Sequence, residues 1–191
     1  MDKHDSRCYK CKNLIYQMLN RIFRKIELKY KVPNIPLSID AHKSSKHYSA
    51  LKKIYRGLIN YRGQKDFIKA RYLQRCDIYI PSEKRIVEID EVQHYSTARL
   101  VSLRKYPEKL KLGYDKTKYK KYCADISSND PDPVFRDEQR AWYDTLRDFL
   151  PYLSNEIKRP TVRIPLGFYA WCKLNTNSKK DIAEFRKLAK L

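Results

Sequence analysis

The stretch from Arg75 to His94, RCDIYIPSEKRIVEIDEVQH, constrains the fold more than any other part of the sequence. Residues 75–80 and 85–90 are rich in residues that favour strands, and the segment between them, Pro81-Ser82-Glu83-Lys84, has the composition of a tight turn. The pattern therefore predicts two antiparallel strands joined as a hairpin.

Alternation along these strands separates apolar from acidic side chains, because successive strand residues point to opposite faces of a sheet. One face gathers four apolar residues that can enter a core: Ile78, Ile80, Val87 and Ile89. The other face gathers three acids, with further polar residues just past the strand end: Asp77, Glu88 and Asp90, then Glu91, Gln93 and His94.

Two interpretations of the acidic face are open. Three neighbouring carboxylates repel one another and carry a desolvation cost, which a divalent cation relieves. Oxygen ligands suit Mg²⁺ or Mn²⁺, and a hydrated Mg²⁺ can activate water and neutralise a phosphate leaving group. The alternative is an exposed strand face whose acids pair with some of the many lysines.

The order of these residues resembles a known motif. An Asp, then Glu-x-Asp, then a nearby His, on a hairpin after an Arg-rich lead-in, resembles the PD-(D/E)XK nuclease superfamily, above all the branch of very-short-patch-repair endonucleases and their restriction-like relatives. The matching residues are Asp77-Ile78 and Val87-Glu88-Ile89-Asp90-Glu91-Val92-Gln93-His94. The match covers these segments closely and about half of the chain loosely.

Two departures from the superfamily pattern concern the second strand. Asp90 occupies the usual lysine position, as in that branch, and Glu91 replaces the glycine that follows. A second register, with Glu91-x-Gln93 as a variant E-x-K, places Glu91 on the wrong face unless a bulge intervenes, so the first register is preferred.

The resemblance implies a fold, a reaction and a set of roles. It implies an α/β (α+β) fold: a restriction-endonuclease-like central mixed sheet of four or five strands flanked by helices, in one nuclease-like domain over residues 1–191. It implies a metal-dependent DNA endonuclease that leaves 5′-phosphate ends. Asp77, Glu88 and Asp90 would hold Mg²⁺ or Mn²⁺, Gln93 would orient the attacking water, and His94 would act as general acid or base.

The charge of the chain points to the same class of partner. The 191 residues carry a formal net charge of +20, and such a field attracts polyanions, nucleic acid above all. Residues 99–122 hold nine Lys or Arg against two acids, interleaved with tyrosines, and residues 95–131 are interpreted as a basic, Tyr-rich insertion for DNA recognition. The alternative is a solvated helical excursion whose tyrosines join the core. The expected nucleic-acid contacts are Arg75, Arg99, Arg104, Lys105, Lys109, Lys111, Lys118, Lys120, Lys121, Arg140 and Arg163.

Other function classes remain open. One is a nucleic-acid-binding protein of the same fold without cleavage, for which the missing lysine argues. Another is an RNA-cleaving nuclease, with RNA in place of DNA as the partner. Cutting both strands of a duplex would require a homodimer or two sequential nicks.

Apolar spacing predicts the remaining elements. Helices are expected over residues 10–31, 46–61 and 133–150, the last with Asp132 as N-cap and Pro151 as its end, and another after a capping box at Ser178. Residues 161–165 fit a strand of the same sheet, with Arg163 facing the site as a phosphate or carboxylate partner. Asp137 and Arg140 form a D-x-x-R pair beside the site or an ordinary ion pair.

The five cysteines suggest a reducing environment. Their number is odd, no secretory signal or membrane span is recognisable, and a cytoplasmic location is expected. Cys8 and Cys11 have the spacing of half a zinc site, but no second pair follows, so the favoured interpretation is two thiols in the first turn of a helix. Cys76, Cys123, Cys172 or His4 could complete such a site only through the fold.

Overall fold

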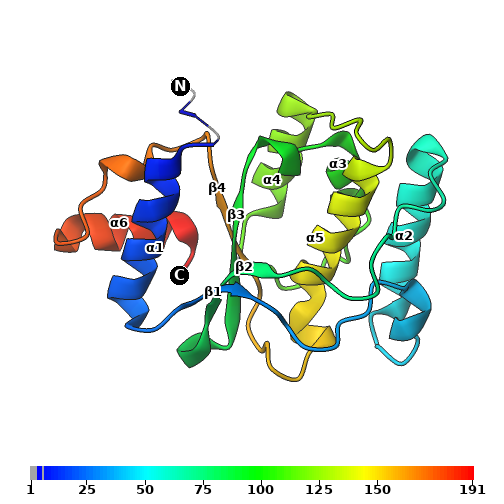
Figure 1. The fold of residues 1–191 in the computed structure, drawn as a ribbon, viewed down its shortest axis with the longest axis horizontal. Coiled ribbons are helices and arrows are strands. Elements are labelled where there is room, and N and C mark those ends of the chain that lie inside the picture. The colour runs from blue at the N-terminus through cyan, green and yellow to red at the C-terminus, as the bar shows by residue number, and fades with distance from the viewer. Residues whose placement is uncertain (1–3, 6) are drawn as a thin grey trace.

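A four-stranded sheet forms the centre of the computed structural model, which describes residues 4–5 and 7–191 (Figure 1). The strands lie in chain order: β1 (Glu27–Tyr30), β2 (Cys76–Ile80), β3 (Arg85–Asp90) and β4 (Val162–Pro165). β2 runs antiparallel to both β1 and β3, whereas β4 runs parallel to β3. The fold is therefore mixed α/β with a mixed sheet, as expected.

The predicted hairpin is confirmed. A short 3₁₀ turn over Pro81–Glu83 joins β2 to β3, and Lys84 completes it in the left-handed conformation at φ 47°. Ile78 pairs with Val87, and this antiparallel register places Asp77 opposite Glu88.

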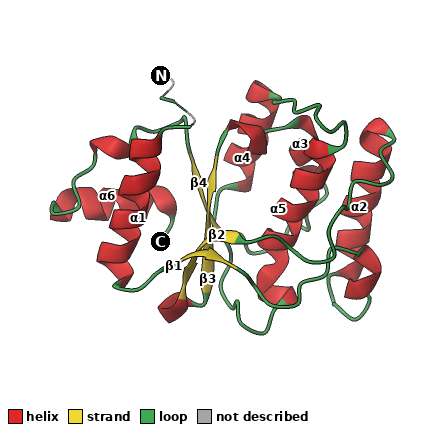
Figure 2. Cartoon of the chain, viewed as in Figure 1, coloured by secondary structure: helices red, strands yellow, loops and turns green. Residues whose placement is uncertain are grey.

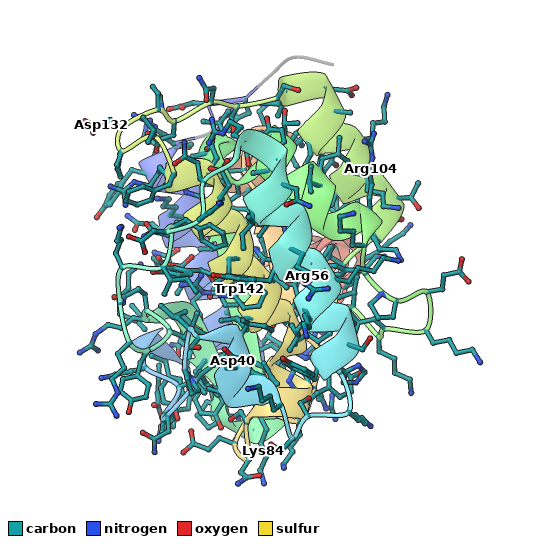
Figure 3. All side chains as sticks on the ribbon, turned by 90° about the vertical axis from the view of Figure 1, so that its right-hand side faces the viewer. Asp40, Arg56, Lys84, Arg104, Asp132 and Trp142 are labelled. Carbon is teal, nitrogen blue, oxygen red and sulfur yellow. The ribbon has the colours of Figure 1, made fainter. Side chains whose placement is uncertain are left out.

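Helices cover both faces of the sheet, which gives three layers (Figure 2). The side chains of Ile78, Ile80, Val87 and Ile89 pack in one core cluster with residues of α1 (Tyr9–Phe23) and α6 (Lys179–Ala189). The opposite face carries the larger cluster, formed with four helices: α2 (Tyr48–Arg62), α3 (Thr97–Arg104), α4 (Lys116–Ile126) and α5 (Arg136–Leu153). In that layer Trp142 of α5 packs against Tyr55 of α2 with ring centroids 5.1 Å apart (Figure 3).

The first predicted helix is too long. Residues 10–31 were expected to be helical, but α1 ends at Phe23, where Arg24 adopts φ 62° and its N–H bonds to the carbonyl oxygen of Asn20. The chain then forms β1, the edge strand paired with β2. Ile22 and Ile26 fit a helical spacing, and only pairing with a distant strand overrides it.

The predicted Tyr-rich insertion contributes to the core. Tyr106, Tyr114 and Tyr119 are buried in the cluster that also holds α3 and α5, and Tyr122 stacks on Phe168 at 3.6 Å between centroids. These tyrosines therefore hold the helical layer together, which was the alternative to stacking on bases.

Two boundaries near α5 differ from the prediction. The helix starts at Arg136 with Phe135 as the N-cap residue, rather than after Asp132, and it continues past Pro151 to Leu153. The predicted strand near residues 161–165 is confirmed as β4, and Ser178 caps α6 by accepting from the N–H of Asp181. Among the helices of the described residues, none combines the length and apolarity required to cross a bilayer.

Candidate active site

Asp77 and Glu88 face each other across the hairpin on the side of the sheet that α5 covers. The N–H of Asp77 donates to Oε1 of Glu88 at 3.2 Å, and the N–H of Ile89 donates to Oδ2 of Asp77 at 3.0 Å. Lys29 of β1 reaches Oδ1 of Asp77 at 2.6 Å. Burial alone would raise the pKa of Asp77, but Lys29 and the N–H of Ile89 lower it below its ordinary value.

Glu88 is the more deeply placed of these two acids. Its side chain is 5% exposed, and Nε of Arg147 on α5 lies 3.4 Å from Oε2. Burial raises the pKa of Glu88 to about 7, because Arg147 offsets the loss of hydration only in part and Asp77 adds a like charge. A second positive charge near Glu88 would favour its ionised form.

Asp90 does not join the other two acids at a common ligand position. Its carboxylate accepts two bonds from Nη1 of Arg163, at 2.8 and 3.1 Å, and is 1% exposed. Within residues 4–5 and 7–191, the oxygens of Asp77, Glu88 and Asp90 do not form a group close enough together to hold one ion. The prediction that Asp90 is a metal ligand therefore needs correction: Arg163 already neutralises it.

The remaining pair, Asp77 and Glu88, offers oxygen ligands of the kind that a hard cation such as Mg²⁺ prefers. This ion keeps several waters and binds through one or two carboxylates together with substrate phosphates. The partly exposed side chain of Asp77, at 24%, leaves one side of the pair open to solvent.

His94 is paired with an acid that the sequence did not single out. Its Nδ1 lies 2.8 Å from Oδ2 of Asp144 on α5 and 3.6 Å from Oδ1 of Asp90. Arg163 and His94 hold the pKa of Asp144 well below its ordinary value despite burial, so this carboxylate is ionised and Nδ1 must be the donor. Burial would lower the pKa of His94, but Asp144 and Asp90 raise it above the ordinary value.

Charges in this network balance when His94 or Glu88 is protonated, or when a cation is added. Four buried acids and three buried arginines make up its centre: Glu88, Asp90, Asp144 and Asp148 with Arg99, Arg147 and Arg163. Arg147 connects Glu88 to the rest of the network, because it contacts both Glu88 and Oδ1 of Asp144, the latter at 3.7 Å. Glu88 and the other buried charges therefore form one electrostatic unit.

Gln93 lies at the strand end beside this unit. Its Nε2 donates to Oε2 of Glu91 at 2.9 Å, and Lys12 of α1 forms an ion pair with the same carboxylate. Among the described residues, no group donates to Oε1 of Gln93, although this atom is buried. An unused buried acceptor next to His94 suits the orientation of a water molecule.

A basic cleft of about 470 Å³ opens over this network. His94 and Arg147 line the cleft and also belong to the network. The other charged residues of its lining are cations: Lys69, Arg136 and Arg140. Arg140 is held in place by Asp130 at 2.9 Å and Asp137 at 3.6 Å, and the contact with Asp137 is the ordinary ion pair that was one of the two interpretations. Such a lining matches the charge of a phosphate backbone.

The other residues predicted to contact nucleic acid divide into two groups. Arg99 and Arg163 are 1% and 2% exposed and bonded to Asp148, so the prediction that they contact nucleic acid is wrong for this structure. Arg163 is instead paired with the carboxylates of Asp90 and Asp148, the other of the two roles expected from the sequence. The side chains of the second group remain exposed or half-buried: Arg75, Arg104, Lys105, Lys109, Lys111, Lys118, Lys120, Lys121 and Arg140.

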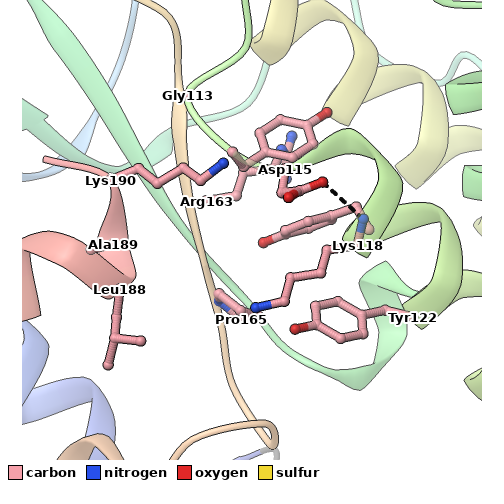
Figure 4. A pocket seen from close by; sticks show the side chains of 11 residues that line it. Gly113, Asp115, Lys118, Tyr122, Arg163, Pro165, Leu188, Ala189 and Lys190 are labelled. Atoms are coloured by element: carbon pink, nitrogen blue, oxygen red, sulfur yellow. Dashed lines mark hydrogen bonds between the residues drawn. The ribbon is translucent and has the colours of Figure 1, made fainter.

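Part of that second group lines further grooves. Lys105 shares a groove of about 340 Å³ with Lys52, Lys53 and Arg56 on α2, the face seen in Figure 3. A much smaller pocket of about 50 Å³ lies between β4, α4 and the end of α6, where Lys118 donates its N–H to Asp115 (Figure 4). That pocket holds no more than a few waters and lies away from Asp77 and Glu88.

Sequence reasoning missed the contribution of α5. Asp144, Arg147 and Asp148 lie one turn apart on the helix face that packs on the sheet, and each contacts the site. The signal was present as charged residues at helical spacing, from Asp137 and Arg140 onward. Charges with this spacing usually mark a solvated face, which is why the pattern alone did not reveal them.

Fold and site together define the class as a mixed α/β protein with a buried acid–arginine–histidine network beneath a basic cleft. No family model, curated protein or solved structure matches the chain.

Proposed function

We propose that this protein is a metal-dependent nuclease that hydrolyses phosphodiester bonds in DNA. The observation that carries the proposal is the pair of opposed carboxylates, Asp77 and Glu88. Arg147 links this pair to the His94–Asp144 pair, and both Arg147 and His94 line the basic cleft. An acid pair, a proton donor and a phosphate-binding surface are the three parts that such a reaction requires.

The order of the elements supports a restriction-endonuclease-like fold. One helix precedes three antiparallel strands, and α5 then crosses over to β4, which is parallel to β3. In such a fold the acids lie on the two strands of the hairpin, as the sequence motif of the PD-(D/E)XK superfamily would require.

Asp77 and Glu88 would hold Mg²⁺ or Mn²⁺, which supplies an activated water and neutralises charge on the phosphate. Asp77 is ionised at neutral pH because Lys29 and the N–H of Ile89 lower its pKa. Glu88 has a pKa of about 7, and binding of a cation would favour the ionised form that ligation requires. Arg147 would hold the carboxylate of Glu88 in place through the ion pair between its Nε and Oε2 of Glu88.

His94 would act as the proton donor. Asp144 and Asp90 raise the pKa of His94 above its ordinary value and so favour its protonated form. Asp144 fixes the ring through Nδ1, so that Nε2 is the atom left for the cleft. As water attacks phosphorus and the bond to the 3′ oxygen breaks, that oxygen would take the proton from His94. The products are then a 3′-hydroxyl and a 5′-phosphate. Gln93 would orient the water through Oε1.

The cleft would bind the phosphate backbone on either side of the cut. Lys69, Arg136 and Arg140 line it, and exposed lysine and arginine contacts give affinity that falls with salt. Arg99 and Arg163 are excluded from this surface, and their role is to neutralise Asp90 and Asp148.

A second candidate function is nucleic-acid binding without cleavage. It is favoured by one observation: each hairpin acid already has a cationic partner, Lys29 for Asp77, Arg147 for Glu88 and Arg163 for Asp90. An RNA substrate would use the same groups, so substrate competition has to separate it from DNA.

The test is cleavage of supercoiled plasmid, linear duplex and single-stranded RNA with Mg²⁺, Mn²⁺ or EDTA. We expect metal-dependent nicking of DNA that Asp77→Asn and Glu88→Gln each abolish, since both variants keep the shape of the side chain. Glu27→Gln is the matched control, because Glu27 lies on β1 opposite Tyr79, away from the pair. Cleavage that survives both site variants would overturn the assignment of the acids. Salt-sensitive binding without cleavage of any substrate would establish the second function instead.

A further inference from the structure

Four potential metal ligands meet at the start of α1, three from residues 4–11 and one from far along the chain. They are His4, Cys8, Cys11 and Cys172, and their ligand atoms all lie within 4.8 Å of one another. Nε2 of His4 is 3.0 Å from Sγ of Cys11 and 3.6 Å from Sγ of Cys172. The set is half-buried around a fully buried Cys11.

These distances match a tetrahedral zinc site. With Zn–S bonds of about 2.3 Å and a Zn–N bond of about 2.0 Å, the ligand atoms of a tetrahedron lie roughly 3.5 to 3.8 Å apart. Closing the cluster on an ion therefore requires shifts of no more than about an ångström. Three sulfurs and one imidazole nitrogen form a set that selects zinc over Mg²⁺ or Ca²⁺.

Backbone donors already point at two of the sulfurs. The N–H of Cys11 donates to Sγ of Cys8 at 3.2 Å, and the N–H of Cys172 donates to Sγ of Cys11 at 3.4 Å. Bonds of this kind orient thiolate ligands and stabilise their negative charge in metal sites. The bond from the N–H of Cys11 also makes Cys8 the N-cap residue of α1.

We propose that His4, Cys8, Cys11 and Cys172 form a structural zinc site. All four ligands come from protein, which leaves no open position for a substrate and assigns the site to structure rather than catalysis. The ion fastens α1 to the 3₁₀ turn Trp171–Lys173, and so joins the two ends of the layer that covers one face of the sheet. The sequence favoured two uninvolved thiols in the first turn of a helix, because Cys172 approaches them only in the fold.

Lys12 connects the proposed zinc site to the strand end beside the candidate active site. Lys12 follows Cys11 directly and forms the ion pair with Glu91 at the end of β3. The zinc site does not depend on nuclease activity, since it stands on a separate set of residues.

The experiment measures metal in the full-length chain purified under reducing conditions without added zinc. We expect one zinc per chain by inductively coupled plasma mass spectrometry, and loss of stoichiometric zinc in Cys8→Ser and Cys11→Ser. Cys123→Ala is the matched control: Cys123 is also a buried free thiol, but it lies in the opposite core cluster and should leave zinc unchanged.

Two further variants separate loss of ligation from loss of folding. His4 lies outside every helix and strand, so His4→Ala should fold yet bind zinc more weakly, whereas His4→Cys should restore binding. Replacing zinc with Co²⁺ should produce the visible absorption of tetrahedral thiolate coordination, absent in Cys11→Ser. A folded chain that takes up no zinc on titration, or that holds these cysteines as a disulfide resistant to alkylation until reduced, would overturn the proposal.

Discussion

Replacing Arg163 by Met tests how the buried network stabilises the fold. Nε of Arg163 donates to Asp148 at 2.8 Å, Nη1 to Asp90 at 2.8 Å, and Nη2 to the carbonyl oxygen of Asp144 at 3.1 Å. Methionine keeps most of the apolar stem and removes all of these donors. Two buried carboxylates then lose their main cationic partner.

The expected cost follows from those contacts. Breaking a buried ion pair by removing one partner costs about 3–5 kcal/mol, because it leaves the other charge buried without compensation. Asp148 retains bonds from Arg99, Tyr106 and Tyr114, so the main loss falls on Asp90. We therefore expect a loss near 4 kcal/mol. For a chain of this size that corresponds to a fall in Tm of roughly 8–16 °C.

Urea unfolding at neutral pH, followed by circular dichroism, measures this loss. Arg104→Met is the matched control, because Arg104 is exposed on α3, and it should change the free energy of unfolding by no more than about 0.5 kcal/mol. A loss below about 1 kcal/mol in Arg163→Met would refute the reasoning that these charges are truly buried and mutually dependent.

The same variant has a dependence on pH that can be worked out. Burial would raise the pKa of Asp148, but Arg163 and Arg99 lower it in the folded state. The wild-type contribution of Asp148 is therefore present above the unfolded pKa of about 3.9 and is lost as pH falls through the folded pKa. Without Arg163 this lowering weakens, so the stability difference between wild type and Arg163→Met should shrink as pH falls below about 4.

Three other substitutions test separate parts of the structure. The folded pKa of His94 lies above its ordinary value, so the stability that its charge contributes is present below about pH 6.5 and is lost as pH rises through the folded pKa. In urea titrations between about pH 6 and pH 9, His94→Gln should therefore flatten the dependence of the free energy of unfolding on pH. An unchanged dependence would contradict the Asp144 pairing. Gly113→Ala should destabilise the fold by roughly 1–3 kcal/mol, because its Cβ would stand 2.5 Å from the carbonyl oxygen of Thr161; equal thermal stability would show that this contact relaxes freely. Tyr119→Leu should lower Tm and leave salt-dependent DNA binding, measured by fluorescence anisotropy, unchanged. Loss of binding at an unchanged Tm would instead show that Tyr119 takes part in DNA recognition.

Local pattern was enough to determine the hairpin and several helices. Alternation along residues 75–90 placed the strands and their acidic face, since the period of side chains in a strand depends only on the backbone. Likewise, Gly63 at φ 75° ends α2, and Ser178 caps α6, because both effects act within one turn. The juxtaposition of Asp77 and Glu88 follows from the same short-range register.

Tertiary structure alone decided which partner each of these groups meets. Residues 27–30 form a strand only because β2 offers hydrogen bonds. Asp90 lies 73 residues from Arg163, and Cys11 lies 161 residues from Cys172, separations over which periodicity carries no information. Whether a charge is solvated, paired or free to bind a ligand depends on what packs over it. That choice is made by the folded core, where burial makes an unpaired charge costly and a matched one stable.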